Sequence, residues 1–188
     1  MQGIETDFLK YEGQIDPKYT GGLNTTLRWK SLSMNLFFTF QAGNVIRLNP
    51  VFSSSYSDIT ALPNEFKDRW IMSGDEQRTD IPAIADNLMQ KLYLSSAYPY
   101  NNYNYSSARV AKGDFIRLKS LSINYELPSA LVRKSRVFKR AAVRLTAKDL
   151  WLMYSDKALN GQDPEFFNTG GVAVPVPKQF TLTLRIGL

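Results

Sequence analysis

The chain has 188 residues, of which 44% are hydrophobic and 21% are charged, and this balance is that of a folded protein. It contains no cysteine and no histidine, which excludes disulfide bonds, thiol nucleophiles, Ser-His-Asp catalysis and zinc sites built from those residues. No apolar run approaches the ~18 residues that a membrane-spanning helix needs. The net charge of +6 is spread along the chain, and solubility is its simplest explanation.

The first part of the chain predicts a hairpin that follows an irregular segment. Residues 1–21 are polar, contain several glycines and include no apolar segment of an export signal, so we expect the chain to begin within a longer protein. Two runs then alternate apolar and polar residues, at about 22–30 and 32–42. A period of two places the apolar side chains on one face of each strand, and the short joint at Lys30-Ser31 predicts a hairpin.

A long insertion occupies residues 43–112 and is rich in Asn, Ser, Tyr and Pro. Within it, residues 64–72 follow Pro63 and are predicted to form a short helix, whereas the tyrosine-rich stretch 98–105 shows neither a helical nor a strand period. Connections of this length inside a compact domain are uncommon and usually functional. We therefore expect the insertion to take part in recognition.

Two further strands are predicted at about 113–126 and 141–153. The first changes parity near Lys119-Ser120, which predicts a β-bulge, and the second changes parity near Asp149. Between the two strands, Ser129 is expected to cap a short helical turn.

The last stretch, at about 179–188, alternates apolar and polar residues without a break from Phe180 to Leu188. Such a strand is expected at the closing edge of a membrane barrel, where its apolar face meets lipid, or at the end of a soluble β-sandwich, where that face meets a core. The aromatic content of 13% is high and suits strands and the aromatic girdles of barrels.

The lengths of the connections favour the barrel. They are short at 30–31, long at 43–112, moderate at 127–140 and long again at 155–178. Outer-membrane barrels alternate short periplasmic turns with long outer loops, and a soluble sandwich gives no reason for that alternation. The predicted fold class is therefore all-β, with antiparallel up-and-down strands in a large transmembrane β-barrel, long extracellular loops and a short helix in one loop.

Several motifs follow one another in a fixed order along nearly the whole chain. They are Tyr19-Thr20-Gly21-Gly22-Leu23-Asn24-Thr25-Thr26, Phe40-Gln41-Ala42-Gly43, the run from Asp114-Phe115-Ile116-Arg117-Leu118 to Tyr125-Glu126-Leu127-Pro128, Val143-Arg144-Leu145-Thr146-Ala147-Lys148-Asp149-Leu150-Trp151, Gly161-Gln162-Asp163-Pro164-Glu165, and Pro175-Val176-Pro177-Lys178-Gln179-Phe180-Thr181-Leu182. This order resembles the late barrel of the SusC/RagA family of TonB-dependent outer-membrane transporters.

The resemblance implies that residues 1–188 are the C-terminal portion of a plugged barrel of about 22 strands. It further implies a nutrient importer for glycans or peptides in the outer membrane of a Gram-negative bacterium, surrounded by outer-membrane lipid. The expected partners are a SusD-like surface lipoprotein and the TonB complex, the latter through an N-terminal part that this sequence does not contain. We expect no enzymatic activity, no cofactor, no metal site and no nucleic-acid partner. One departure is that barrel proteins often end in an aromatic residue, whereas this chain ends in Leu188.

Two sets of candidate site residues follow from these expectations. Tyrosines of the long insertion are candidates for contact with substrate or with the lipoprotein lid, the alternative being ordinary packing within the loop. Polar-face residues of the strands are candidates for lining the lumen. The first set is Tyr93, Tyr98, Tyr100, Tyr103 and Tyr105; the second is Arg28, Asn35, Arg117, Arg144, Lys148 and Arg185.

Particular residues suggest other functions. Asp163 and Glu165 suggest an acid/base pair of a glycosidase or calcium ligands, but a structural loop motif explains them better because a third ligand cluster is lacking. The basic residues of 133–140 suggest nucleic-acid binding, but a solvated turn is the better explanation since no recognition fold accompanies them. A secreted carbohydrate-binding β-sandwich, with the tyrosine-rich loop on glycan, is the main alternative to the transporter.

Overall fold

The computed structural model describes residues 9–53, 62–89, 91–92, 99–133, 138–167 and 174–187. The chain divides into two compact units. The sheet unit comprises residues 13–46 and 112–188, and the insertion unit comprises residues 1–12 and 47–111. Tyr93, Tyr98 and Leu188, together with Lys134 and Arg136 of the basic run, lie outside the described residues.

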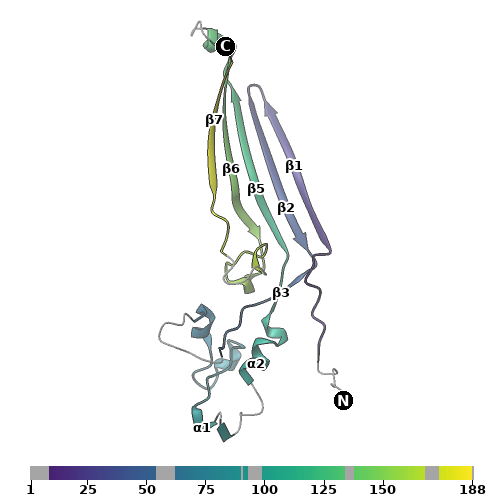
Figure 1. Ribbon diagram of the computed structural model, residues 1–188, viewed down its shortest axis with the longest axis vertical. Helices are drawn as coiled ribbons and strands as arrows, with labels where there is room; N and C mark the ends of the chain where they lie inside the picture. Colours follow the sequence, from purple (N-terminus) through teal and green to yellow (C-terminus); the bar gives the residue numbers. More distant parts are fainter. Residues whose placement is uncertain are drawn as a thin grey trace. The chain divides into compact units, whose positions relative to one another are not determined.

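The sheet unit is built on five long strands (Figure 1). Each strand pairs antiparallel with its neighbours, and the order β1-β2-β5-β6-β7 follows the chain. This is the predicted up-and-down arrangement, and it confirms the predicted fold class. The strands are β1 (Tyr19–Trp29), β2 (Leu32–Ala42), β5 (Phe115–Glu126), β6 (Arg140–Tyr154) and β7 (Gln179–Gly187). A separate two-stranded sheet pairs β3 (Val45–Arg47) with β4 (Val110–Lys112).

The register gives the five-stranded sheet one apolar and one polar face. A row of aligned residues runs across all five strands on the apolar face: Leu27, Met34, Ile123, Leu145 and Leu182. The adjacent row on the opposite face is polar throughout: Thr26, Asn35, Ser122, Thr146 and Thr181. A slip of one residue in any strand would exchange its faces, so the alternation in the sequence fixes the register.

The predicted irregularities in β5 and β6 occur next to each other. Lys119 is skipped in the pairing of β5 with both β2 and β6, because Leu118 and Ser120 carry the pairs on either side. On β6, the residues between Lys148 and Trp151 are likewise skipped, and Asp149 has a positive φ of 51°. The bulge predicted near Lys119-Ser120 is confirmed, and the parity change near Asp149 coincides with the irregularity in β6.

Two consecutive glycines in β1 allow phenylalanine rings of β2 to lie against the backbone. A Cβ on Gly21 would come within 2.7 Å of the Phe40 ring on the apolar face. A Cβ on Gly22 would come within 2.9 Å of the Phe37 ring on the polar face. The Gly-Gly pair is therefore required by close packing on both faces, although glycine weakens a strand.

The ends of β2 and β5 are tied together before the chain enters the insertion and after it leaves. The Gly43 amide donates to Asp114 Oδ1 at 2.7 Å, and the Gly113 amide donates to the Asn44 carbonyl at 3.0 Å. Asn44 is buried, and its side chain occupies the space where Gly113 lacks a Cβ. This clasp fixes where the insertion begins and ends on the sheet unit.

The remaining connections of the sheet unit contain a tight hairpin turn and short helical turns. Lys30 has a positive φ of 52° in the β1–β2 hairpin, α3 spans Ser129–Arg133 as the serine predicted, and η5 spans Lys157–Leu159 in the β6–β7 connection. Of the basic run, Lys139 and Arg140 are exposed. None of the helices in the described part of the chain is long and apolar enough to cross a membrane.

The insertion unit contains short helices. They are η1 (Asn64–Asp68), η2 (Asp75–Gln77), α1 (Asn87–Met89), α2 (Pro99–Asn104) and η4 (Ser107–Arg109). The helix predicted at 64–72 is present as the shorter η1. The expectation of no regular structure at 98–105 is wrong, because α2 forms there. Proline is well suited to the first helical position, and the packing described next holds the remainder of the helix.

The insertion unit has a small hydrophobic core of its own. Val51, Phe52 and Ile81 are buried, and Phe66, Tyr100 and Tyr103 pack around them. The Phe52 ring lies 4.7 Å from the Tyr100 centroid, 5.8 Å from that of Tyr103 and 5.9 Å from that of Phe66. These separations are those of favourable aromatic pairs, so α2 is stabilised by the rings that it contributes.

Candidate functional site

The polar face of the sheet contains all six predicted lumen-facing residues. Arg28 and Arg144 belong to one cross-strand row with Ser33, Asn124 and Thr183. Lys148 is paired with Ser120 and Gln179, and Arg185 with Ala142, on the same face. Asn35 and Arg117 complete the set, paired with Ser122 and Thr39 respectively. The structure thus brings these residues to one face, where Asn35 and Arg144 belong to a first group toward the hairpin end of the strands and Arg117 to a second group toward the other end.

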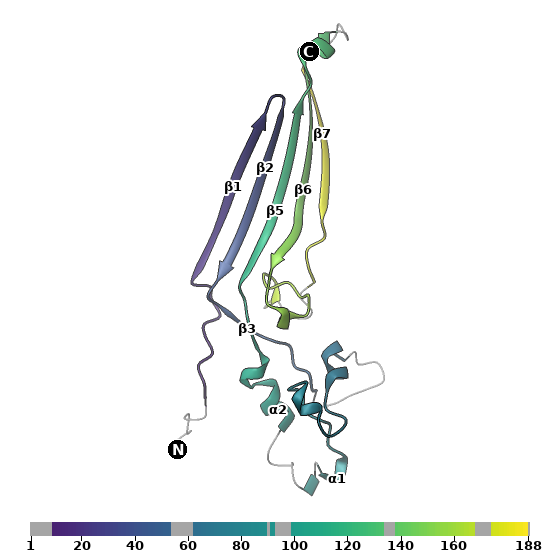
Figure 2. The same ribbon diagram turned by 180° about the vertical axis from the view of Figure 1, so that it is seen from behind.

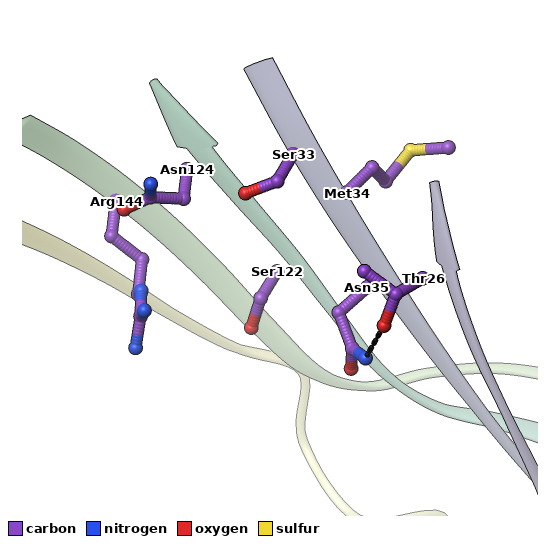
Figure 3. Close-up of a pocket in the computed structure, with 7 residues that line it drawn as sticks. All are labelled: Thr26, Ser33, Met34, Asn35, Ser122, Asn124 and Arg144. Atoms are coloured by element: carbon purple, nitrogen blue, oxygen red, sulfur yellow. Dashed lines mark hydrogen bonds between the residues drawn. The ribbon is translucent and has the colours of Figure 1, made fainter. Parts of the chain in front are cut away.

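The first group surrounds a hollow of about 310 Å³ on the polar face. Its lining is Thr26, Ser33, Met34, Asn35, Ser122, Asn124 and Arg144 (Figure 3). Asn35 Nδ2 donates to Asn24 Oδ1 at 2.8 Å and to Thr26 Oγ1 at 3.0 Å. The hydroxyls of Ser122 and Thr146 lie 3.2 Å apart, so the polar side chains of neighbouring strands bond to one another.

Arg144 is the charged residue of this hollow. Its guanidinium reaches along the face from β6, whereas Asn35 and Thr26 meet across β1 and β2 (Figure 3). The Arg144 Nε atom is buried and lacks a hydrogen-bond partner among the described residues. A buried donor without a partner is costly, so this position suits an acceptor that is supplied from outside the described chain.

The second group is an ion-paired cluster at the end of the sheet that carries the long connections. Arg117 Nη2 lies 2.5 Å from Asp163 Oδ1, and Arg117 Nε lies 3.4 Å from Glu165 Oε2. Lys119 Nζ lies 3.0 Å from Asp149 Oδ1 and 3.7 Å from Glu165 Oε2. The two bulge residues therefore pair with each other, and the β6–β7 connection pairs with β5.

This cluster disfavours both chemical interpretations of Asp163 and Glu165. The Asp163 side chain is fully covered and engaged by Arg117, so it does not present an open carboxylate to a substrate. No group of three or more acidic, histidine or cysteine side chains among the described residues is placed to hold a metal ion. Asp163 and Glu165 therefore form a structural loop motif, which is the interpretation that the sequence favours.

The candidate tyrosines divide between the core and the surface. Tyr100 and Tyr103 pack against Phe52, and burial raises the pKa of the Tyr103 hydroxyl. The Tyr100 hydroxyl accepts from the Ala85 amide at 2.6 Å and donates to the Ala83 carbonyl at 3.3 Å. Tyr105 is 66% exposed, and the Arg47 guanidinium lies 5.6 Å from its ring centroid. Of the described tyrosines of this set, Tyr105 alone offers most of its surface to a partner.

Buried polar residues of the insertion were not singled out from the sequence. Asn104 Oδ1 accepts from the amides of Val51 and Phe52, and its Nδ2 donates to the Phe52 carbonyl at 2.8 Å. Arg109 donates to Glu65 Oε2 and to the Asn49 carbonyl, each at 2.5 Å. Their partners lie 44 to 60 residues away, so no local sequence signal could have identified these contacts.

The apolar face of the sheet is exposed, and most of its aromatic residues lie toward the two ends of the strands, with Phe38 and Phe180 between them. The row from Leu27 to Leu182 contains no aromatic residue, and Leu182 is 72% exposed. Among the described residues no second layer covers this face, as a soluble sandwich would require. Girdles of this kind flank the lipid-facing band of membrane barrels. Trp29 and Tyr125 lie toward the hairpin end, and Tyr19, Phe40, Trp151 and Tyr154 toward the other.

Comparison with known proteins agrees with this architecture. No protein-family model matches the chain. It is 29% identical over 162 residues to TonB-dependent receptor P3 of Formosa agariphila, which is 86% of this chain and 14% of that protein. It is 26% identical over 196 residues to TonB-dependent receptor P26 of the same organism, which is 97% of this chain and 18% of that protein.

Solved structures show the same fold. The RagAB peptide importer in the "open-open" state matches with a TM-score of 0.65 and 23% identity, over 95% of this chain and 18% of that one. The RagAB peptide transporter matches with a TM-score of 0.63 and 23% identity, over 94% and 18%. The chain thus spans between 14% and 18% of the length of the proteins that it matches. The chain is therefore similar in sequence to a segment of TonB-dependent receptors, and its fold is that of a segment of the solved RagAB structures.

Proposed function

We propose that this chain forms part of the wall of an outer-membrane nutrient importer in a Gram-negative bacterium. The observation that carries the proposal is the two-faced sheet, with an uncovered apolar face bounded by aromatic residues and an opposite face of hydrogen-bonding and charged side chains. A lipid bilayer and an aqueous or plug-filled lumen are the two surroundings that match those faces.

The five strands are not a complete transporter. The outer strands β1 and β7 each leave one edge unpaired within the described sheet, and lipid cannot satisfy the free backbone groups of such edges. The transport path therefore requires the remaining strands of the barrel. We propose that residues 1–188 are one continuous portion of it, with the long connections 43–112 and 155–178 on the outer side.

The substrates that we propose are peptides or glycans, since a peptide importer is among the similar solved structures. The proposed partners are a SusD-like surface lipoprotein on the outer side and the TonB complex on the periplasmic side. Among the described candidate tyrosines Tyr100, Tyr103 and Tyr105, Tyr105 best suits contact with a substrate or with the lipoprotein, because it is the exposed one. We propose no enzymatic step and no cofactor for this segment.

Deletion of the receptor gene in the source bacterium tests the proposal. Uptake of fluorescent oligopeptides and of fluorescent oligosaccharides would be measured in the deletion strain and after complementation with the intact gene. We expect loss of uptake for one of the two classes and recovery on complementation, together with the receptor in the outer-membrane fraction. Unchanged uptake of both classes with the receptor in the soluble fraction would contradict the proposal.

A further inference from the structure

The first part of the β6–β7 connection, residues 156–167, folds back over the polar face of the sheet. Residues 156–167, which we name the strap, form a compact segment beside the ends of β6 and β7 (Figure 2). Leu159, Asp163 and Phe167 of the strap are buried. On the sheet, Phe115 and Arg117 are buried on the same face, where Arg117 contacts the strap directly. Burial of polar-face positions in β5 is thus confined to the end that the strap covers.

A buried ion pair holds the middle of the strap. The side chains of Arg117 and Asp163 are 3% and 0% exposed. The Asp163 Oδ1 atom that contacts Arg117 also accepts from the Glu165 amide at 3.0 Å, so one carboxylate closes the turn of the strap and binds the strand. Separation of a buried pair leaves two charges without compensation, which is strongly unfavourable. The pair therefore resists detachment of the strap.

Two further contacts hold the strap on either side of that pair. At its start, Asp156 accepts from the Lys112 amide at 2.9 Å and from the Ala158 amide at 3.0 Å, and these bonds lower the pKa of its carboxyl group. Further along, Glu165 reaches both Arg117 and Lys119. The β-bulge at Lys119 re-aims a side chain, as bulges do, and here it directs the lysine toward Glu165.

We propose that the strap is a permanently attached part of the inner wall, which narrows the passage through the barrel at the end that carries the long connections. Glu165, whose side chain is 35% exposed, is the acidic group that the strap presents to the passage, and Lys157 at its start is also exposed. This inference rests on the proposed function for the existence of a passage. The attachment itself rests only on the contacts of Arg117, Asp163 and Asp156.

Hydrogen–deuterium exchange of the intact receptor in lipid nanodiscs, read by mass spectrometry on peptides covering 156–167, tests the attachment. The variants are Asp163→Asn and Arg117→Met, which remove one partner of the buried pair. Glu165→Gln is the matched control within the strap, because it leaves the buried pair intact. Arg144→Met is the control on the same face, since Arg144 lies in the hollow and not under the strap. Heat-modifiable gel migration shows which variants have folded.

We expect slow exchange at the Glu165 and Phe166 amides, whose acceptors are both on Asp163, in the unmodified receptor. Asp163→Asn should accelerate exchange of the strap at least ~10-fold, whereas Glu165→Gln should change it less than ~3-fold, as expected when a local opening equilibrium is shifted. Arg144→Met should have no effect there. Exchange of the strap at the rate of an unstructured peptide in the unmodified receptor would overturn the proposal, and so would an unchanged strap in a folded Asp163→Asn variant.

If neither Asp163→Asn nor Arg117→Met folds, attachment of the strap is judged from its exchange rates in the unmodified receptor and in Glu165→Gln. The measurement needs no substrate, lipoprotein or TonB, so its failure is distinguishable from failure of the proposed function. That function is read separately, by the uptake experiment.

Discussion

The two units of the molecule differ in what surrounds their apolar side chains. The insertion unit turns Phe52, Val51 and Ile81 toward one another and buries them within the chain. The sheet unit instead leaves large apolar side chains such as Trp29 and Leu182 at 70% and 72% exposure. Apolar area of this extent is unfavourable in water, so the sheet needs an apolar surrounding that the chain does not provide. The insertion is therefore stabilised by packing within the chain, whereas the sheet depends on an apolar environment outside it.

The polar side chains of the two units also differ in the groups to which they bond. In the insertion, Asn104 and Arg109 are buried and bonded to backbone carbonyls or amides of their own unit. In the sheet, Asn35 and Ser122 instead bond to side chains of neighbouring strands. Both units also contain a buried arginine Nε without a hydrogen-bond partner among the described residues, for example that of Arg109 in the insertion and that of Arg144 in the sheet. The insertion is therefore expected to respond to substitution as a small soluble domain does, and the sheet as a membrane barrel does.

The largest effect is expected for Phe52→Ala, which removes the ring that three aromatic neighbours contact. Truncation of a buried phenylalanine costs about 3–5 kcal/mol. The insertion should unfold locally, while the barrel retains its heat-modifiable migration. Limited proteolysis of the receptor, with cleavage sites mapped by mass spectrometry, measures this. Loss of the barrel signal together with cleavage of the insertion would contradict independent stabilisation of the two units.

In the sheet, the corresponding substitution is Leu182→Arg, on the exposed apolar face. A charge near the bilayer midplane should cost about 2–4 kcal/mol of folding free energy. Thr181→Lys is the matched control, because Thr181 is the adjacent residue on the polar face and is exposed. Folding into lipid vesicles against urea measures both variants. Equal destabilisation by the two would contradict the assignment of the faces.

A smaller effect is expected for Asn104→Leu in the insertion. The substitution leaves the amides of Val51 and Phe52 and the Phe52 carbonyl without their partner, at a cost of about 1–3 kcal/mol. Asn101→Ala is the control, since Asn101 is exposed on the same helix. Proteolytic half-lives of the insertion should shorten for Asn104→Leu and remain unchanged for Asn101→Ala, and a reversed order would show that α2 is held by other contacts.

Part of this structure can be predicted from the sequence alone. The five strands and both faces follow from the period of two, since each residue's face depends only on its own strand and its bulge. The bulge at Lys119 appeared as a parity change for the same reason. Helix α2 was missed because its stability depends on Phe52 and Val51, about fifty residues away, and not on its own propensity. The Arg117–Asp163 pair was missed because it joins residues 46 positions apart.

The smallest effect concerns pH in the insertion. The amides of Met72 and Ile71 donate to Asp75 and lower the pKa of its carboxyl group below the ordinary value of 3.8. A lowered carboxyl pKa stabilises the turn above that ordinary value, and the contribution is lost as the pH falls through the lower pKa of the folded state. Amide exchange at Ile71 and Met72, corrected for intrinsic rates, should therefore increase as the pH falls below the ordinary value of 3.8. Asp75→Asn should remove the dependence, and a dependence that persists in this variant would assign it to another group.

The central claim is that one face of the sheet meets lipid and the other does not. Site-directed spin labels on β7, at Phe180, Thr181, Leu182 and Thr183 in turn, test it most directly in the intact receptor reconstituted in lipid. This chain has no cysteine, so cysteines elsewhere in the receptor would be replaced by serine before labelling. Collision rates with oxygen, which dissolves in lipid, and with a water-soluble nickel chelate would be measured for each label. The account predicts high oxygen and low nickel accessibility at Phe180 and Leu182, and reduced oxygen accessibility at Thr181 and Thr183. Equal accessibilities at all four positions, or high nickel accessibility at Leu182, would contradict it.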